Sequence, residues 1–139
     1  MKVIIVGCGR VGSRLASEMA GNGDDVTVID RSQSQLDLAA SRGALPADFS
    51  GTAVVGDGTD PELLKRAGIE NADVFIAVTE GDNRNIMAAQ IAQAIYKVPK
   101  VVCRINDPVR EDAYRKMGLQ TYCPTIVGSE AILSMIGAK

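Results

Sequence analysis

The chain has 139 residues, of which 46% are hydrophobic, 23% are charged and 14 are glycine. A chain of this length and composition folds as one globular domain without disulfides or metals. It contains no histidine, which excludes Ser-His-Asp and Cys-His nucleophile systems and imidazole metal sites. The net charge of −2, with Lys and Arg dispersed along the chain, offers no basic surface to nucleic acid.

Three cysteines, at positions 8, 103 and 123, have neither a CxxC spacing nor neighbouring metal-type ligands. An odd number does not make a complete disulfide framework, so we expect reduced thiols in a cytoplasmic protein. The N-terminus enters an apolar strand without the longer apolar stretch and cleavage site of a signal peptide. No run of 18 apolar residues occurs, so we expect no direct membrane insertion.

Short continuous apolar segments alternate with helical patterns along the whole chain. This alternation is typical of parallel strands that are covered on both faces by helices. We expect strands at 2–6, 26–30, 52–55, 73–78, 100–105 and 120–123, and helices at 11–21, 33–42, 61–67, 83–97, 108–117 and 129–136. The sequence therefore predicts one α/β domain of Rossmann type, with a doubly wound, six-stranded parallel sheet in the order 3-2-1-4-5-6.

Capping signals mark several helix ends. A carboxylate before a proline predicts a helix start, and a glycine after the last turn predicts a left-handed residue that ends a helix. These signals occur at Asp60-Pro61, Asp107-Pro108, Gly43, Gly68 and Gly118.

The segment Gly7-Cys8-Gly9-Arg10-Val11-Gly12 follows the first expected strand and opens the first helix. In this G-x-G-x-x-G pattern, Gly7 permits the tight turn, Gly9 lets backbone approach a phosphate pair and Gly12 lets the helix pack closely. The free N–H groups at the helix start attract an anion. Glycine-rich turns without a ligand are also common, so the motif needs support from its surroundings.

Asp30 supplies that support, because it ends the second expected strand 18 residues after Gly12. An acidic side chain there accepts hydrogen bonds from ribose hydroxyls and repels a 2′-phosphate. Arg31 offsets part of that repulsion or stacks on an adenine. A solvated loop with a helix N-cap at Ser32 is the alternative interpretation.

Three further groups are candidates for ligand contacts. Arg10 adds a bidentate charge for a pyrophosphate or terminal phosphate, or else faces solvent. The carboxylate of Asp57, between Gly56 and Gly58, suits an adenine amino group, although a turn and helix start explain the same residues. Residues 79–85 follow the fourth strand at the ligand edge of the sheet, where we expect Asp82 to cap a helix.

With these residues assembled, the chain resembles the RCK N-terminal domains, also called TrkA-N or KTN domains, which regulate potassium channels and transporters from the cytoplasm. The resemblance extends from the first strand to about Pro124. It rests on IIVGCGRVG at 4–12, Asp30, Gly56-Asp57, DVFIAVT at 73–79 with Asn85, and VVCRINDP at 101–108.

The resemblance implies a bound nucleotide, either NAD(H) or an adenine nucleotide (ATP, ADP or AMP). It assigns phosphates to the glycine turn, the ribose to the end of the second strand and the adenine to the end of the third. Arg104 is implied at the phosphate edge or at a subunit contact, with a plain surface residue as the alternative. The expected site comprises Gly7, Cys8, Gly9, Arg10, Val11, Gly12, Asp30, Arg31, Gly56, Asp57, Gly58, Thr79, Asn85 and Arg104, with no catalytic and no metal-binding residue.

The function implied by the resemblance is a regulatory subunit or domain of a potassium transporter or channel, in which ligand binding shifts how two domains pair. Such a protein is cytoplasmic and reaches the inner face of the membrane through its transporter partner. The alternative is an NAD-dependent oxidoreductase. It is disfavoured because the sequence has no histidine, and because its Tyr-x-x-x-Lys spacing, from Tyr96 to Lys100, falls at the expected end of a helix. A scaffold with an empty glycine turn is a third interpretation.

Many members of the family continue into a C-terminal ligand-binding domain, whereas this chain stops at Lys139. We therefore expect residues 1–139 to form the N-terminal domain alone. The last expected helix, 129–136, is heavily apolar; it packs on its own sheet or, as we favour, crosses to a second subunit. A homo-oligomer follows from the second alternative, either a dimer or a larger assembly such as an octameric ring.

Overall fold

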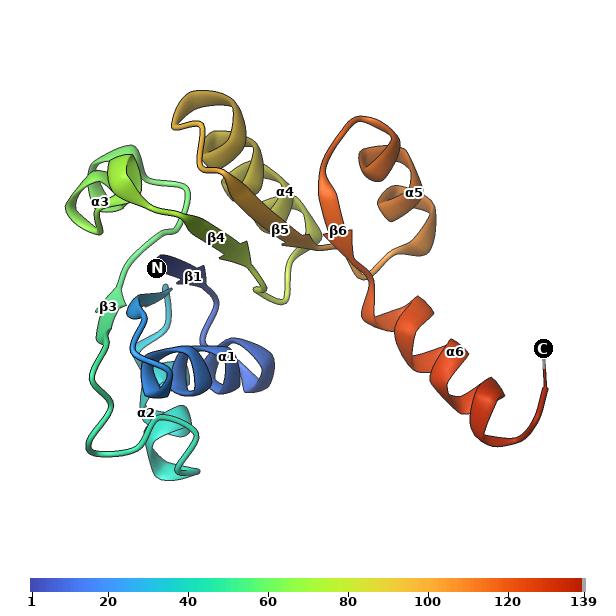
Figure 1. The fold of residues 1–139 in the computed structure, drawn as a ribbon, viewed down its shortest axis with the longest axis horizontal. Helices are drawn as coiled ribbons and strands as arrows, with labels where there is room; N and C mark the ends of the chain where they lie inside the picture. Colours follow the sequence, from blue (N-terminus) through green and yellow to red (C-terminus); the bar gives the residue numbers. More distant parts are fainter. Residues whose placement is uncertain (139) are drawn as a thin grey trace.

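Six parallel strands form one sheet in the computed structural model, which describes residues 1–138 (Figure 1). The strand order is β3-β2-β1-β4-β5-β6, which confirms the expected doubly wound topology. The strands are β1 (Lys2–Val6), β2 (Asp25–Asp30), β3 (Thr52–Val55), β4 (Val74–Ala77), β5 (Lys100–Arg104) and β6 (Gln120–Tyr122).

Helices follow every strand and cover both faces of the sheet. Figure 1 shows α1 and α2 on one side of the strands and α3, α4 and α5 on the other. The helices are α1 (Arg10–Gly21), α2 (Gln33–Ser41), α3 (Pro61–Arg66), α4 (Asp82–Gln90), α5 (Pro108–Lys116) and α6 (Pro124–Met135), with a 3₁₀ turn η1 (Ile69–Asn71) and a π-helical turn η2 (Ile91–Ile95).

Two hydrophobic clusters, one on each face, hold the helices to the sheet. Successive strand residues point to opposite faces, so the alternate residues of β1 divide between the clusters. Val3 and Ile5 pack with α1 and α2, whereas Ile4 and Val6 pack with α3, η1 and α4. Burial on both faces explains why the strands are continuously apolar rather than alternating.

The capping predictions are confirmed at both aspartate-proline pairs and at all three glycines. Asp60 Oδ1 accepts from the N–H of Glu62 at 3.0 Å, and Asp107 Oδ1 accepts from the N–H of Val109 at 3.0 Å. The three glycines have left-handed φ values of 73°, 88° and 101°, in the order Gly43, Gly68 and Gly118.

The prediction that Asp82 caps its own helix is wrong. The N-cap of α4 is Gly81, which makes no side-chain capping bond. Asp82 instead accepts from the N–H of Asn106 at 2.8 Å and from the N–H of Asp107 at 3.1 Å. Its carboxylate therefore binds the loop between β5 and α5 to the start of α4, a long-range contact that local spacing does not indicate.

Two expected helices differ from the observed ones. The expected helix 83–97 changes from α4 to the π-helical η2, where the N–H of Tyr96 donates to the carbonyl of Ile91 at 3.3 Å. The expected last helix, 129–136, begins at Pro124 and ends at Met135. Proline at a first helical position needs no N–H partner, so this start follows the same rule as at α3 and α5.

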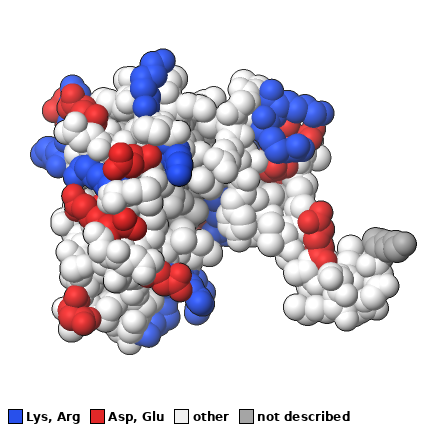
Figure 2. All heavy atoms as spheres, viewed as in Figure 1, with Lys and Arg blue, Asp and Glu red and all other residues white. Residues whose placement is uncertain are grey.

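Helix α6 extends away from the rest of the molecule and has no buried residue (Figure 1). Its large apolar side chains are exposed, including Ile132 at 61% and Met135 at 83%. Figure 2 shows this projecting end as a surface with little charge. Within residues 1–138, no helix combines the length and the apolar character needed to cross a bilayer.

Candidate functional site

A cavity of about 530 Å³ lies at the carboxyl ends of the strands, where doubly wound sheets bind their ligands. Its walls come from the ends of β1 to β5 and from the first turns of α1, α2 and α4. Its floor is apolar and includes Val6, Ile29 and Val78. The topology therefore brings together residues that lie as far apart in sequence as Gly7 and Arg104.

The glycine turn closes one side of the cavity, and its glycines are required for different reasons. Gly7 has a left-handed φ of 111°, and its N–H donates to the carbonyl of Ile29 at 2.7 Å. A Cβ on Gly12 would lie 1.7 Å from the carbonyl oxygen of Gly7. A Cβ on Gly9 would meet nothing within 4 Å, because Gly9 faces the cavity. Gly7 and Gly12 are thus needed by the fold, whereas Gly9 leaves space for a ligand.

Asp30 organises the turn from the end of β2. Its Oδ2 accepts from the N–H of Cys8 at 2.8 Å, and its Oδ1 accepts from the N–H of Ser32 at 2.9 Å. A carboxylate has about four lone-pair positions, so two remain for hydroxyl donors in the cavity. Ser32 also caps α2 by accepting from the N–H of Gln35 at 3.3 Å, which confirms the helix N-cap, whereas the ribose contact of Asp30 stays a prediction.

Cys8 lies behind the turn, fully buried, and does not line the cavity. Burial, with a smaller contribution from the Asp30 carboxylate, raises the pKa of the Cys8 thiol to about 11. The thiol is therefore neutral near pH 7 and packs as a small apolar group.

Asp57 lies just after β3 and also lines the cavity. Its Oδ1 accepts from the hydroxyl of Thr59 at 2.7 Å and from the N–H of Thr59 at 2.9 Å. These hydrogen bonds, followed by the charges of Arg84 and Arg31, lower the pKa of Asp57 below its ordinary value. The carboxylate is therefore ionised at neutral pH and presents a hydrogen-bond acceptor to the cavity. Arg84 Nη1 lies 3.7 Å from Asp57 Oδ1.

Asn85 joins the ends of β4 and β5 beneath the cavity. It is fully buried, and its Oδ1 accepts from the N–H and the hydroxyl of Thr79 at 2.8 and 2.7 Å. Its Nδ2 donates to the carbonyls of Thr79 and Arg104 at 2.9 and 3.0 Å. All the polar atoms of this amide are thus used within the chain. Thr79 and Arg104 face the cavity, and Asn85 supports them from behind.

The charges around the cavity favour an anion. Five arginines line it, against the three acidic residues Asp30, Asp57 and Glu80. Guanidinium groups bind phosphate oxygens in a bidentate manner, and the N-terminus of α1 adds a partial positive charge. The arginines are Arg10, Arg31, Arg42, Arg84 and Arg104.

Eleven of the fourteen residues expected from the sequence line this cavity, and three do not. Cys8, Gly12 and Asn85 lie in the layer behind the wall, where they shape the turn and the strand ends. Arg42 and Arg84 are lining residues that were not among the fourteen. Arg84 lies within the polar segment 79–85 noted above. Arg42 follows the end of α2 and is part of no sequence motif.

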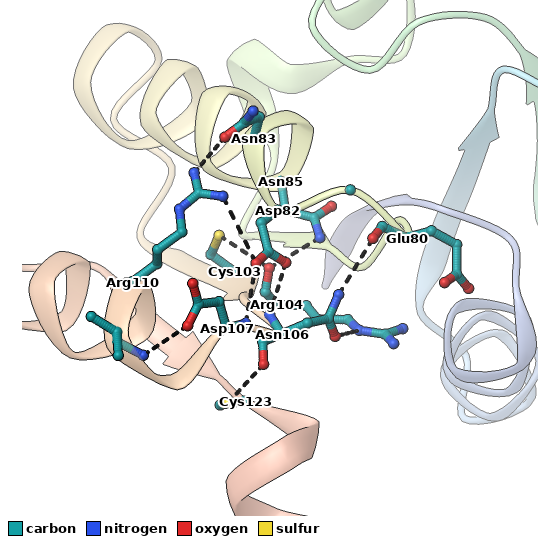
Figure 3. A network of polar contacts seen from close by, with 12 residues as sticks. Glu80, Asp82, Asn83, Asn85, Cys103, Arg104, Asn106, Asp107, Arg110 and Cys123 are labelled. Carbon is teal, nitrogen blue, oxygen red and sulfur yellow. Dashed lines mark hydrogen bonds and ion pairs between the residues drawn. The ribbon is translucent and has the colours of Figure 1, made fainter.

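A second polar network lies beside the cavity, around Asn106 in the loop after β5 (Figure 3). The side-chain Oδ1 of Asn106 accepts from Arg104 Nε at 2.9 Å, and its Nδ2 donates to the carbonyl of Glu80 at 3.3 Å. Asp82 holds the backbone of the same loop, and Arg110 lies 4.0 Å from the Asp82 carboxylate. This network fixes Arg104 at the cavity edge.

Taken together, the doubly wound sheet, the glycine turn after β1 and the acidic residue that ends β2 define a Rossmann-type domain. Residues 3–124 match the family of the TrkA-N domain. The chain belongs to this family, in agreement with the resemblance seen in the sequence.

Relatives with the name Trk system potassium uptake protein TrkA are similar to this chain. The Streptomyces coelicolor protein is 43% identical over 121 residues, which cover 87% of this chain and 52% of the relative. A TrkA homolog from Methanothermobacter thermautotrophicus is 35% identical over 119 residues, covering 86% and 52%. The chain thus spans about half the length of these curated relatives.

Solved structures share the fold. The TrkA-N domain of the inner membrane protein ybaL from Escherichia coli has a TM-score of 0.79 at 21% identity, covering 96% of this chain and 95% of that one. The Shewanella denitrificans Kef CTD in its AMP-bound form has a TM-score of 0.78 at 22% identity, covering 100% and 84%. At these identities the likeness concerns the fold alone.

Proposed function

We propose that the chain is a nucleotide-binding regulatory domain of a potassium uptake system, and that its ligand is NAD(H) or an adenine nucleotide. The observation that carries the proposal is the arginine-rich cavity bounded by the glycine turn and by Asp30. The names of the TrkA relatives and the AMP-bound form of the Kef structure support it.

In this proposal, each wall of the cavity binds a different part of the ligand. Phosphates lie against Gly9 and the N-terminus of α1, where Arg10 adds charge. Ribose hydroxyls donate to the free positions of the Asp30 carboxylate, and the adenine lies toward Asp57 and Gly58. The fixed acceptors and N–H groups bind these parts without any proton transfer.

Binding without turnover is the function that the lining residues support best. Hydride transfer usually requires a positioned acid or base and a wall that excludes water from the substrate. The described residues that line the cavity include no His, Tyr, Lys or Cys. We therefore propose a binding module rather than the oxidoreductase considered above.

Asp30→Ala is expected to weaken the binding of ribose-bearing ligands by about 1–3 kcal/mol, because it removes a charged hydrogen-bond acceptor. Isothermal titration calorimetry with ADP and NADH measures the change. Asp37→Ala, on the outer part of α2, is the matched control, since Asp37 does not line the cavity. Equal affinities of the Asp30→Ala variant and the native chain would remove Asp30 from the site.

The regulatory role requires partners. We propose that the domain forms a homo-oligomer through α6, and that the oligomer acts from the cytoplasmic side on a membrane-embedded potassium transporter or channel. A nucleotide shifts the equilibrium between two arrangements of such an oligomer only if it binds the two arrangements with different affinities. The exposed apolar side chains of α6 offer the contact surface, and a patch of this kind is typical of an interface.

Ile132→Glu is expected to shift the chain from an oligomer to a monomer, because a charge in an apolar interface is not paired. Light scattering coupled to size-exclusion chromatography measures the mass. Ser134→Glu is the control, since Ser134 shares a side of α6 with Glu130, the single charged residue of that helix. An unchanged mass for Ile132→Glu would exclude this face of α6 from the interface.

A further inference from the structure

Asn106 is hydrogen-bonded to the wall of the cavity and to the start of α6. On the cavity side, its side chain binds the Nε of Arg104 at 2.9 Å and the carbonyl of Glu80 at 3.3 Å (Figure 3). Arg104 and Glu80 both line the cavity. The side-chain amide therefore links two residues of that wall.

The backbone carbonyl of Asn106 binds the segment at the start of α6. It accepts from the hydroxyl of Thr125, in the first turn of α6, at 2.8 Å, and from the thiol of Cys123 at 3.6 Å. Among the residues that the structure describes, the hydroxyl of Thr125 makes the one hydrogen bond that joins α6 to the rest of the domain, apart from the helical bond of the Val127 N–H to the N-cap residue Cys123. Because no residue of α6 is buried, this contact has a large influence on the direction of the helix.

The contact to α6 is connected to the start of α4 through one peptide group, and the side chain that contacts the cavity wall branches from the Cα next to that group. The carbonyl of Asn106 and the N–H of Asp107 lie in the same plane, and that N–H donates to Asp82 Oδ2 at 3.1 Å. The N–H of Asn106 donates to Asp82 Oδ1 at 2.8 Å. A rotation of the Asn106–Asp107 peptide therefore changes the bond to Thr125 and the bond from Asp107 to Asp82, at the start of α4, at the same time.

We propose that Asn106 is a positioning residue that couples the occupancy of the cavity to the orientation of α6. An anionic ligand that takes the Nε–H of Arg104 displaces Asn106 Oδ1 from it, so the Asn106 side chain moves and the bond to Thr125 weakens. This inference rests on the proposed nucleotide site and adds the route by which occupancy reaches the proposed oligomer contact.

The first test needs no ligand and uses hydrogen exchange of the α6 amides from Val127 to Ala131. Thr125→Val removes the bond directly, and Arg104→Ala removes the cavity-side partner of Asn106. Both are expected to accelerate this exchange by about threefold to tenfold, the range for losing one hydrogen bond. Arg31→Ala, in the same cavity but outside the network, is expected to leave it unchanged.

The second test adds ATP to the full chain. ATP is expected to accelerate exchange in α6 of the native chain and to have no further effect in Thr125→Val. Because coupling is reciprocal, Thr125→Val is also expected to bind ATP about threefold more tightly, although Thr125 does not line the cavity.

These outcomes separate the two proposals. If hydrogen exchange in α6 is no faster in Arg104→Ala than in the native chain, the coupling through Asn106 is overturned, even if ATP binds. A Thr125→Val variant with native ATP affinity would also overturn it. Failure of ATP and NADH to bind the native chain would instead contradict the proposed function, and the ligand-free test would still decide whether Asn106 connects the cavity wall to α6.

Discussion

Gly12→Ala is expected to lower the free energy of unfolding by about 3 kcal/mol or more, because its Cβ would overlap the backbone of the preceding turn. That Cβ would lie 1.7 Å from the carbonyl oxygen of Gly7 and 2.8 Å from its carbon. Neither atom can give way without moving the turn or shifting α1 from the sheet. Urea unfolding followed by circular dichroism measures the loss.

Gly21→Ala is the matched control for Gly12→Ala. Gly21 ends the same helix, has no left-handed φ and would place its Cβ in open space. Alanine there is expected to leave the stability unchanged or raise it slightly, since alanine favours helix over glycine. A Gly12→Ala variant as stable as Gly21→Ala would contradict the close packing of α1 on the turn.

Gly9→Ala is expected to reduce nucleotide affinity at least about tenfold while changing the free energy of unfolding by less than about 1 kcal/mol. Gly9 has φ −78°, which alanine adopts readily, and a Cβ there would meet nothing within 4 Å. The added methyl group occupies the space beside Gly9 in which we propose that the phosphates bind. Calorimetry with ADP and NADH, beside urea unfolding of the same variant, separates the two effects.

The contrast between Gly9 and Gly12 distinguishes a ligand site from a structural turn. If the turn served packing alone, Gly9→Ala would bind ligands as the native chain does. Loss of stability in Gly9→Ala comparable to that in Gly12→Ala would likewise contradict the open geometry at Gly9.

The sheet and its order were predictable because local signals and the global fold agree. The apolar strands are buried on both faces, and prolines and glycines mark the helix ends at positions such as Pro61 and Gly68. Rules for connections between parallel strands then leave few topologies. The family resemblance, drawn from the same residues, was confirmed over residues 3–124.

Two of the features that sequence reasoning missed depend on contacts between distant segments. Asp82 binds the loop at residues 106–107 rather than its own helix, and no spacing rule indicates such a partner. Arg42 reaches the cavity from the end of α2, which a linear motif does not show. The start of α6 at Pro124 was predictable from the proline rule that succeeded at α3 and α5.

The division between lining and supporting residues also required the structure. Asn85 and Thr79 both fit the family pattern, yet the amide of Asn85 is fully used beneath the cavity, whereas Thr79 lines it. A motif indicates which residues form a site but not the direction in which each side chain points.

Calorimetric titration of the native chain with ATP, ADP, NAD⁺ and NADH tests the central claim most directly. We expect at least one of them to bind with a stoichiometry of one ligand per chain, and we expect Gly9→Ala and Asp30→Ala to weaken this binding. Absence of binding for all four ligands to folded protein, or binding that both substitutions leave unchanged, would contradict a nucleotide site in this cavity.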